Sequence, residues 1–152
     1  MKDRFKFRVW DKEYKNMFYP EEEYDYIEID ANGGLCGYVS DGLWVGGLNC
    51  ILIQCTGLKD KKGTLIYEGD IVRLIADTFT TTYVVKFGDF AMFSLDFQSK
   101  YEKGSTAVYG WYLDGMKYPI PLSISLDTSG LKLDVIGNKY ENPELLSVRN
   151  EE

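Results

Sequence analysis

One stretch of the chain decides the fold. Residues 54–72 read QCTGLKDKKGTLIYEGDIV, which predicts the end of one strand, a tight charged turn and a bent entry into a second strand. Gly57 and Gly63 bracket a lysine-rich turn whose tip must face water. Gly69 permits a sharp bend, and Asp70 can hold that bend by accepting hydrogen bonds from nearby backbone N–H groups. We therefore interpret this stretch as scaffold.

The rest of the chain shows the pattern of short strands. Apolar and polar residues alternate over residues 5–9, so we expect Phe5, Phe7 and Val9 to form the inner face of a strand. Residues 81–95 are interpreted as a hairpin that turns at Gly88-Asp89. Many short strands with turns between them predict an all-β fold, either a small SH3-like barrel or a β-sandwich with an N-terminal β-subdomain.

The C-terminal part contains the helical signal. Asn142 is a suitable N-cap and Pro143 suits the first helical position, so a short helix is predicted near residues 142–149. Just before it, Gly137 and Asn138 are expected to supply a bend with positive φ.

The length of 152 residues suits one compact domain or two small β-subdomains. We predict an N-terminal β-subdomain at 1–55, an SH3-like barrel subdomain at 56–146 and a polar tail at 147–152. One continuous fold is the alternative.

Composition excludes several kinds of chemistry. The chain has no histidine, which removes Ser-His-Asp and Cys-His catalysis and every His-containing metal site. Its three cysteines include no CxxC pair and fit a reducing compartment. We see neither a signal peptide nor a membrane-spanning run, and expect a cytoplasmic protein without cofactor or bound metal.

An acidic, tyrosine-rich segment at residues 21–30 is the first candidate site. It reads EEEYDYIEID. The segment is interpreted as a solvated acidic edge, with a protein-docking surface and a hard-cation site as alternatives. For docking, the residues of interest are Glu21, Glu22, Glu23, Tyr24 and Tyr26.

Three aromatic residues of a strand predicted over residues 106–113 are the second candidate. Alternation places Tyr109 and Trp111 on one face and Tyr112 on the other. One face is expected to be core, and an open face of this kind can stack bases or grip a peptide.

Three blocks of sequence resemble the YopX-like family of phage and prophage proteins. They are KFRVWD at residues 6–11, the motif from Thr56 to Val72, and VIGNKYENPELL at residues 135–146. They follow the family order and span nearly the whole chain. The resemblance implies a small phage-encoded β protein of unknown role, with no catalytic residues to carry over.

The sequence therefore predicts a non-catalytic phage or prophage accessory protein that binds a protein partner, from the host or the phage. The alternative is a single-stranded nucleic-acid module that uses the aromatic residues. The net charge of −7 makes nucleic acid the less favoured partner. An enzyme acting through the carboxylates of Asp60, Glu68 and Asp70 is a third, weaker reading. Homo-oligomerisation is left open.

Overall fold

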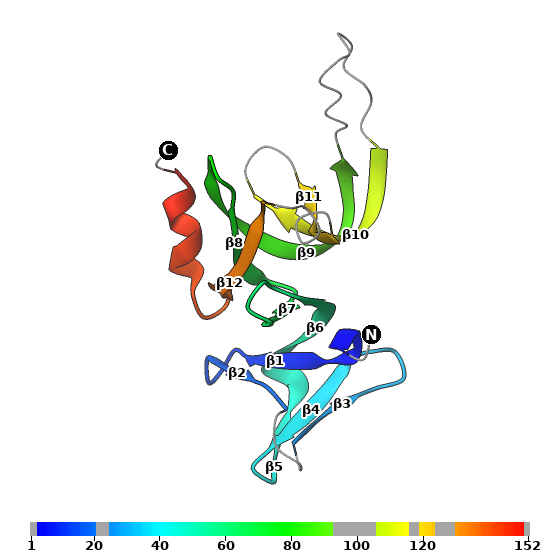
Figure 1. The fold of residues 1–152 in the computed structure, drawn as a ribbon. Coiled ribbons are helices and arrows are strands. Elements are labelled where there is room, and N and C mark those ends of the chain that lie inside the picture. Colours follow the sequence, from blue (N-terminus) through cyan, green and yellow to red (C-terminus); the bar gives the residue numbers. More distant parts are fainter. Residues whose placement is uncertain (1–2, 21–24, 93–105, 116–118, 124–129, 151–152) are drawn as a thin grey trace. The chain divides into compact units, whose positions relative to one another are not determined.

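The computed structural model describes residues 3–20, 25–92, 106–115, 119–123 and 130–150. The chain divides into two compact units, Met1–Leu58 and Lys59–Glu152. Each unit is built from antiparallel strands, which confirms the predicted all-β class (Figure 1). The two units are described separately below.

The described residues of the first unit form six strands and two 3-10 helices. Strand β1 pairs with β2 on one side and with β6 on the other, and β3, β4 and β5 form a second sheet. Strand β6 ends where the second unit begins. In chain order the elements are η1 (Asp3–Phe5), β1 (Phe7–Asp11), β2 (Asn16–Phe18), β3 (Tyr26–Ile29), β4 (Leu35–Ser40), β5 (Leu43–Gly46), η2 (Gly47–Asn49) and β6 (Cys50–Lys59).

The core of the first unit lies around Val9, Phe18 and Tyr38. The rings of Phe18 and Tyr38 stack with their centroids 4.4 Å apart. The predicted inner face is wrong at Phe5, which belongs to η1 and is 66% exposed. Strand β1 is instead buried at four consecutive residues from Arg8 onward, so period-2 alternation does not separate an inner from an outer face there.

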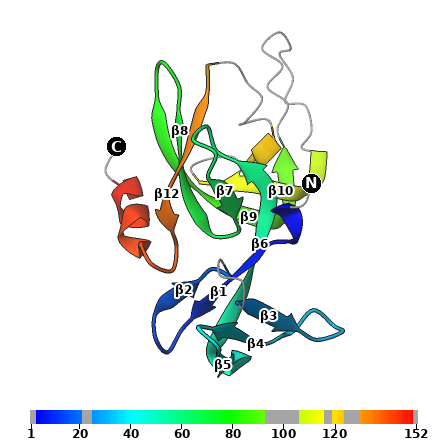
Figure 2. The same cartoon turned by 60° about the horizontal axis from the view of Figure 1, so that its bottom comes forward.

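The second unit is organised around one five-stranded sheet with the order β11-β10-β9-β8-β12. The long strand β9 curves, and β12 lies beside β8 in both ribbon views (Figure 1 and Figure 2). The elements are β7 (Leu65–Tyr67), β8 (Asp70–Ile75), β9 (Thr80–Met92), β10 (Thr106–Asp114), β11 (Ile120–Pro121), β12 (Lys132–Asn138) and η3 (Pro143–Asn150).

The hairpin predicted at 81–95 is wrong in its turn. Strand β9 continues through Gly88-Asp89, and its partner in the hairpin is β10. Gly88 faces Gly110 across the two strands in an uninterrupted register. A glycine and an aspartate were interpreted as a turn, but cross-strand pairing holds them extended. We call the paired strands β9 and β10 the long ribbon.

The bend at Gly69 is confirmed. Gly69 has φ +77°, and the backbone N–H of Tyr67 donates to Asp70 Oδ2 over 2.8 Å. Gly69 also donates its N–H to the carbonyl of Val85 and accepts one from Lys139. The bend therefore joins the start of β8 to β9 and to the residue that follows β12.

The predicted positive-φ bend at Gly137-Asn138 is wrong, because neither residue has positive φ. Gly137 is required for space instead: a Cβ there would lie 2.5 Å from Oδ1 of Asn142. Asn138 forms the turn with its side chain, since its Oδ1 accepts the backbone N–H groups of Tyr140 and Glu141. The turn leads into η3, which begins at Pro143 as predicted and is a 3-10 helix.

Candidate functional site

The candidate residues at the acidic segment are only partly described. Glu21, Glu22, Glu23 and Tyr24 lie outside the described residues. Tyr26 begins β3 and is 53% exposed.

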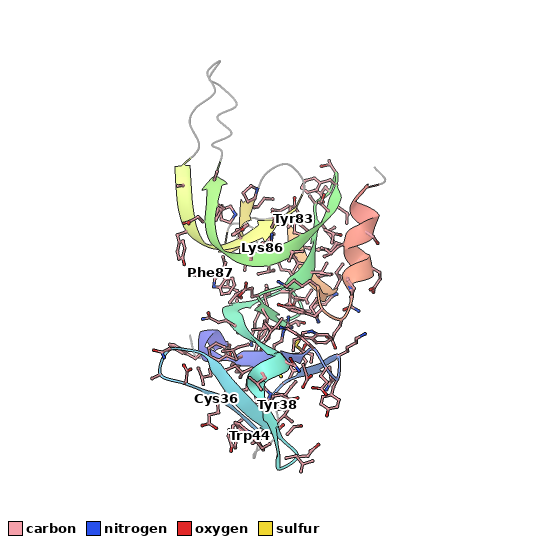
Figure 3. All side chains as sticks on the ribbon, turned by 180° about the vertical axis from the view of Figure 1, so that it is seen from behind. Cys36, Tyr38, Trp44, Tyr83, Lys86 and Phe87 are labelled. Carbon is pink, nitrogen blue, oxygen red and sulfur yellow. The ribbon has the colours of Figure 1, made fainter. Side chains whose placement is uncertain are left out.

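The aromatic residues of β10 form a cluster together with a residue of β9. Phe87 packs its ring against Tyr109, with centroids 5.0 Å apart and planes at 76°. It also packs against Trp111, with centroids 4.7 Å apart at 53°. Phe87 and Tyr109 are 45% and 67% exposed, and Trp111 is half-buried. We call Phe87, Tyr109 and Trp111 the aromatic cluster; Figure 3 shows Phe87 on its strand.

Sequence reasoning missed Phe87. The residue was assigned to a strand that ended in a turn immediately after it. In the structure Phe87 is the cross-strand partner of Trp111, and Tyr109 is the partner of Asp89 two residues along. A hairpin pairing of 80–92 with 106–114 would have placed Phe87 between the two predicted aromatics.

The other face of the long ribbon is different. Tyr112 lies there, as alternation predicts, and stacks on the buried ring of Phe90 with centroids 4.8 Å apart. Lys86 and Asp114 form an ion pair on this face over 2.6 Å. Tyr112 is therefore a packing residue, and only Tyr109 and Trp111 of the three predicted aromatics belong to the cluster.

Among the residues of β9 and β10, the charge on the cluster face is negative. Asp89 is exposed and shares that face, because it pairs with Tyr109 in an unbroken register. Lys86 is the only basic residue of β9 and β10, and it lies on the opposite face. The cluster thus combines exposed rings with one carboxylate and no cation from its own strands.

The first unit carries a second set of exposed aromatics. Tyr26, Val39 and Trp44 are aligned across β3, β4 and β5. Trp44 is 51% exposed, and its indole lies against Gly37, where a Cβ would come within 2.5 Å of it. Val39 is buried between the two aromatics. These rings cover the sheet, so we assign them a packing role.

Asp11 is the centre of a buried polar cluster in the first unit. Oδ1 of Asp11 accepts the N–H groups of Glu13 and Tyr14, and Oδ2 accepts the hydroxyl of Tyr38 over 3.2 Å. Burial and the nearby Asp11 raise the pKa of Tyr38 to about 12 and that of Cys50 to about 11. Both groups are protonated at neutral pH, so neither is an activated nucleophile or base.

Asp60 of the central motif also has a structural role. Oδ1 of Asp60 accepts the N–H groups of Lys62 and Thr64, and Oδ2 accepts that of Val135 over 3.1 Å. Burial opposes ionisation of Asp60, but these backbone hydrogen bonds outweigh it and lower the pKa. General-acid chemistry needs a raised pKa, and Asp60 departs in the opposite direction.

Within the described ranges, no group of three or more His, Cys, Asp or Glu residues is placed to hold a metal ion. The same residues include no helix of the length and apolarity that a membrane span requires.

Comparisons with known proteins agree with this architecture. Two solved structures resemble the chain, each at 24% sequence identity and a TM-score of 0.59: protein EF1440 from Enterococcus faecalis and protein yopX from Bacillus subtilis. The first likeness covers 93% of this chain and 96% of the other, and the second covers 94% and 98%. No curated protein matches. The family model of the YopX protein matches residues 6–147, and the chain therefore belongs to the YopX family.

Proposed function

We propose that this protein is a non-catalytic, phage- or prophage-encoded accessory protein that acts in the cytoplasm by binding another protein. The observation that carries the proposal is the aromatic cluster of Phe87, Tyr109 and Trp111, exposed on the long ribbon. Contiguous exposed aromatic surface marks interaction sites more often than isolated apolar residues do.

The cluster is also suited to binding because it is already ordered. Each ring contacts a neighbouring ring, and the strands beneath them pair continuously from Val84 to Met92. Aromatic side chains lose little conformational entropy when a partner covers them, since only two torsions need to be fixed. A partner that covers these rings gains apolar contact at low ordering cost.

Catalysis finds little support in the same structure. The buried Asp60 and Asp11 are occupied by backbone hydrogen bonds, and the Cys50 thiol has a raised pKa. These groups serve the fold, so binding is the activity that the described surface favours.

Nucleic acid is the less favoured ligand. Affinity for phosphates depends on lysine and arginine, and the strands of the cluster contribute only Lys86, on the other face. In the lysine-rich turn, Lys62 is paired with Asp134 over 3.0 Å. We expect weak binding of a mixed single-stranded oligonucleotide near physiological salt. Submicromolar, salt-sensitive binding in fluorescence anisotropy would reverse the order of the two functions.

The test of protein binding uses the cluster itself. Tagged wild-type protein and the double variant Phe87→Ala/Tyr109→Ala are used to capture partners from host lysate, with Tyr14→Ala as the control. Tyr14 is 73% exposed and lies in the first unit, outside the cluster. We expect a partner retained by wild type and by the control but lost with the double variant, and confirmed with purified proteins by calorimetry.

Circular dichroism establishes that the double variant is folded. If the folded double variant captures the same proteins in the same amounts, the cluster is not the binding surface. The acidic segment at residues 21–24 with Tyr26 is then the next surface to be substituted.

A further inference from the structure

We infer that the aromatic cluster recognises a cationic side chain, lysine or arginine, presented by a basic segment of the partner. This inference rests on the proposed function and specifies the chemistry of the partner. It is drawn from the arrangement of the rings together with the distribution of charge over the two faces of the long ribbon.

The rings present π surfaces in different directions. The plane of Phe87 is at 76° to that of Tyr109 and at 53° to that of Trp111. A cation within about 6 Å of a ring centroid is attracted by the negative face of the ring. Rings that are tilted against one another, rather than coplanar, allow one cation to approach more than one of them.

The carboxylate of Asp89 favours a cation at the cluster. Asp89 is exposed on the same face and pairs directly with Tyr109, so its side chain neighbours the cluster. Within the described part of the chain, Asp89 has no salt-bridge partner. A lysine or arginine over the rings can therefore also approach a carboxylate.

The repelling charge is on the other face. Lys86 lies next to Phe87 in the sequence, but its Nζ is 2.6 Å from Oδ2 of Asp114 on the opposite face of the ribbon. The two faces of the long ribbon therefore differ in charge. On one face Lys86 is neutralised by Asp114, and on the other the carboxylate of Asp89 is exposed beside the rings. An acidic or phosphate-bearing ligand would meet Asp89 with no cation from β9 or β10 on the same face.

The net charge of the whole chain adds a long-range electrostatic attraction for basic partners. The charge of −7 raises their encounter rate at low salt. That attraction acts on any basic molecule and at any place on the surface. An experiment must therefore separate the local contribution of Asp89 and the rings from the contribution of net charge.

Short fluorescent peptides separate the two contributions. Three probes alternate threonine with lysine, glutamine or glutamate, and a fourth probe is a single-stranded oligothymidine. Binding is followed by anisotropy at about 0.15 M ionic strength, where the Debye length is about 8 Å and long-range attraction is reduced. We expect the lysine probe to bind most tightly.

Matched variants then locate the site. Asp89→Asn and Asp77→Asn each remove one negative charge from an exposed aspartate of the second unit, but only Asp89 neighbours the cluster. Tyr109→Ala and Tyr14→Ala each remove one exposed ring. We expect Asp89→Asn and Tyr109→Ala each to weaken the lysine probe about two- to fivefold, and the two controls to leave it unchanged.

The outcomes distinguish this inference from the proposed function. It is overturned if the lysine probe binds no better than the glutamine probe, or if Asp89→Asn behaves like Asp77→Asn. The proposed function then stands or falls on the capture experiment alone. Tighter binding of the oligothymidine overturns both and supports the nucleic-acid reading.

Discussion

Both units expose aromatic rings, but the rings of the first unit pack against its sheet, whereas those of the second unit pack against one another. In the β3-β4-β5 sheet, the indole of Trp44 lies against Gly37, and Val39 is buried between Tyr26 and Trp44. On the long ribbon, the rings of the aromatic cluster contact one another. Exposure alone therefore does not identify a binding site. What a ring covers decides whether removing it harms the fold or only the surface.

The largest effect is expected at the glycine beneath Trp44. In Gly37→Val, the new Cβ meets the carbonyl oxygen of Val45 and the indole of Trp44. Overpacking of this kind costs about 3 kcal/mol, because backbone must move. Gly46→Ala is the control. Gly46 is the cross-strand partner of Gly37, and a Cβ at Gly46 meets nothing within 4 Å. Urea midpoints followed by circular dichroism measure both, and equal midpoints would refute the packing role of Trp44.

The next effect compares the two kinds of ring directly. Trp44→Ala uncovers Val39 and removes a half-buried indole, which costs about 2 kcal/mol by buried area. Tyr109→Ala removes a ring that is 67% exposed and costs at most about 1 kcal/mol, mainly its contact with Phe87. The same urea experiment ranks them. A Tyr109→Ala loss as large as that of Trp44→Ala would make the cluster structural.

A third test uses the buried aspartate of the second unit. Asp60→Asn replaces one accepting oxygen by an N–H₂ group, which leaves a backbone N–H without its acceptor and costs about 2 kcal/mol at neutral pH. The pKa of Asp60 is lowered in the folded protein. Its contribution is therefore complete above the unfolded pKa of about 4 and is lost as pH falls through the folded value.

Stability curves of wild type and Asp60→Asn measured against pH check this. The gap between the two curves should narrow as pH falls below the unfolded pKa of about 4, and it should close only below the lowered pKa of the folded protein, where the wild-type carboxylate becomes protonated. A gap that stays constant down to low pH would show that the Asp60 charge contributes nothing. Asp11 also has a lowered pKa, and it contributes the same loss of stability in acid to wild type and to Asp60→Asn.

The smallest effect is expected at Gly69, where a Cβ would meet both a positive φ and the flexible end of the Lys139 side chain, whose Cε would lie 3.0 Å away. Its φ of +77° strains any residue with a Cβ, so Gly69→Ala should cost about 1 kcal/mol. Gly69→Asn should cost less, because asparagine tolerates this region. Lys61→Ala in the exposed turn is the reference, and thermal midpoints rank the three. A Gly69→Ala midpoint equal to that of Lys61→Ala would show that the bend tolerates a Cβ.

The features that could be predicted from the sequence are those that depend on residues close together along the chain. The bend at Gly69, the helix start at Pro143 and the all-β class depend on the residues in place and on alternation, and all three are confirmed. Trp111 and Tyr109 could be assigned to a common face for the same reason. The partner strand could not be assigned, so Phe87 was missed.

Signals that depend on distant neighbours failed. The sequence predicts a turn at Gly88, whereas the continuous pairing of β9 with β10 on both sides of Gly88 keeps the strand extended. Gly137 was expected to bend the chain, whereas its lack of a Cβ makes room for the side chain of Asn142. Phe5 was placed in a core by its spacing alone. In each case a contact that the local pattern does not contain decides the conformation.

The hydrogen bond from Val135 to Asp60 has a consequence for the order in which the chain folds. It closes a sequence separation of 75 residues, and the strand it belongs to, β12, is the partner of β8. Such closure is slow compared with local pairing. During synthesis the first unit has all of its strands by Lys59. The sheet of the second unit cannot be completed until β12 has been synthesised. Until then β8 is an unpaired edge strand, to which another chain can pair.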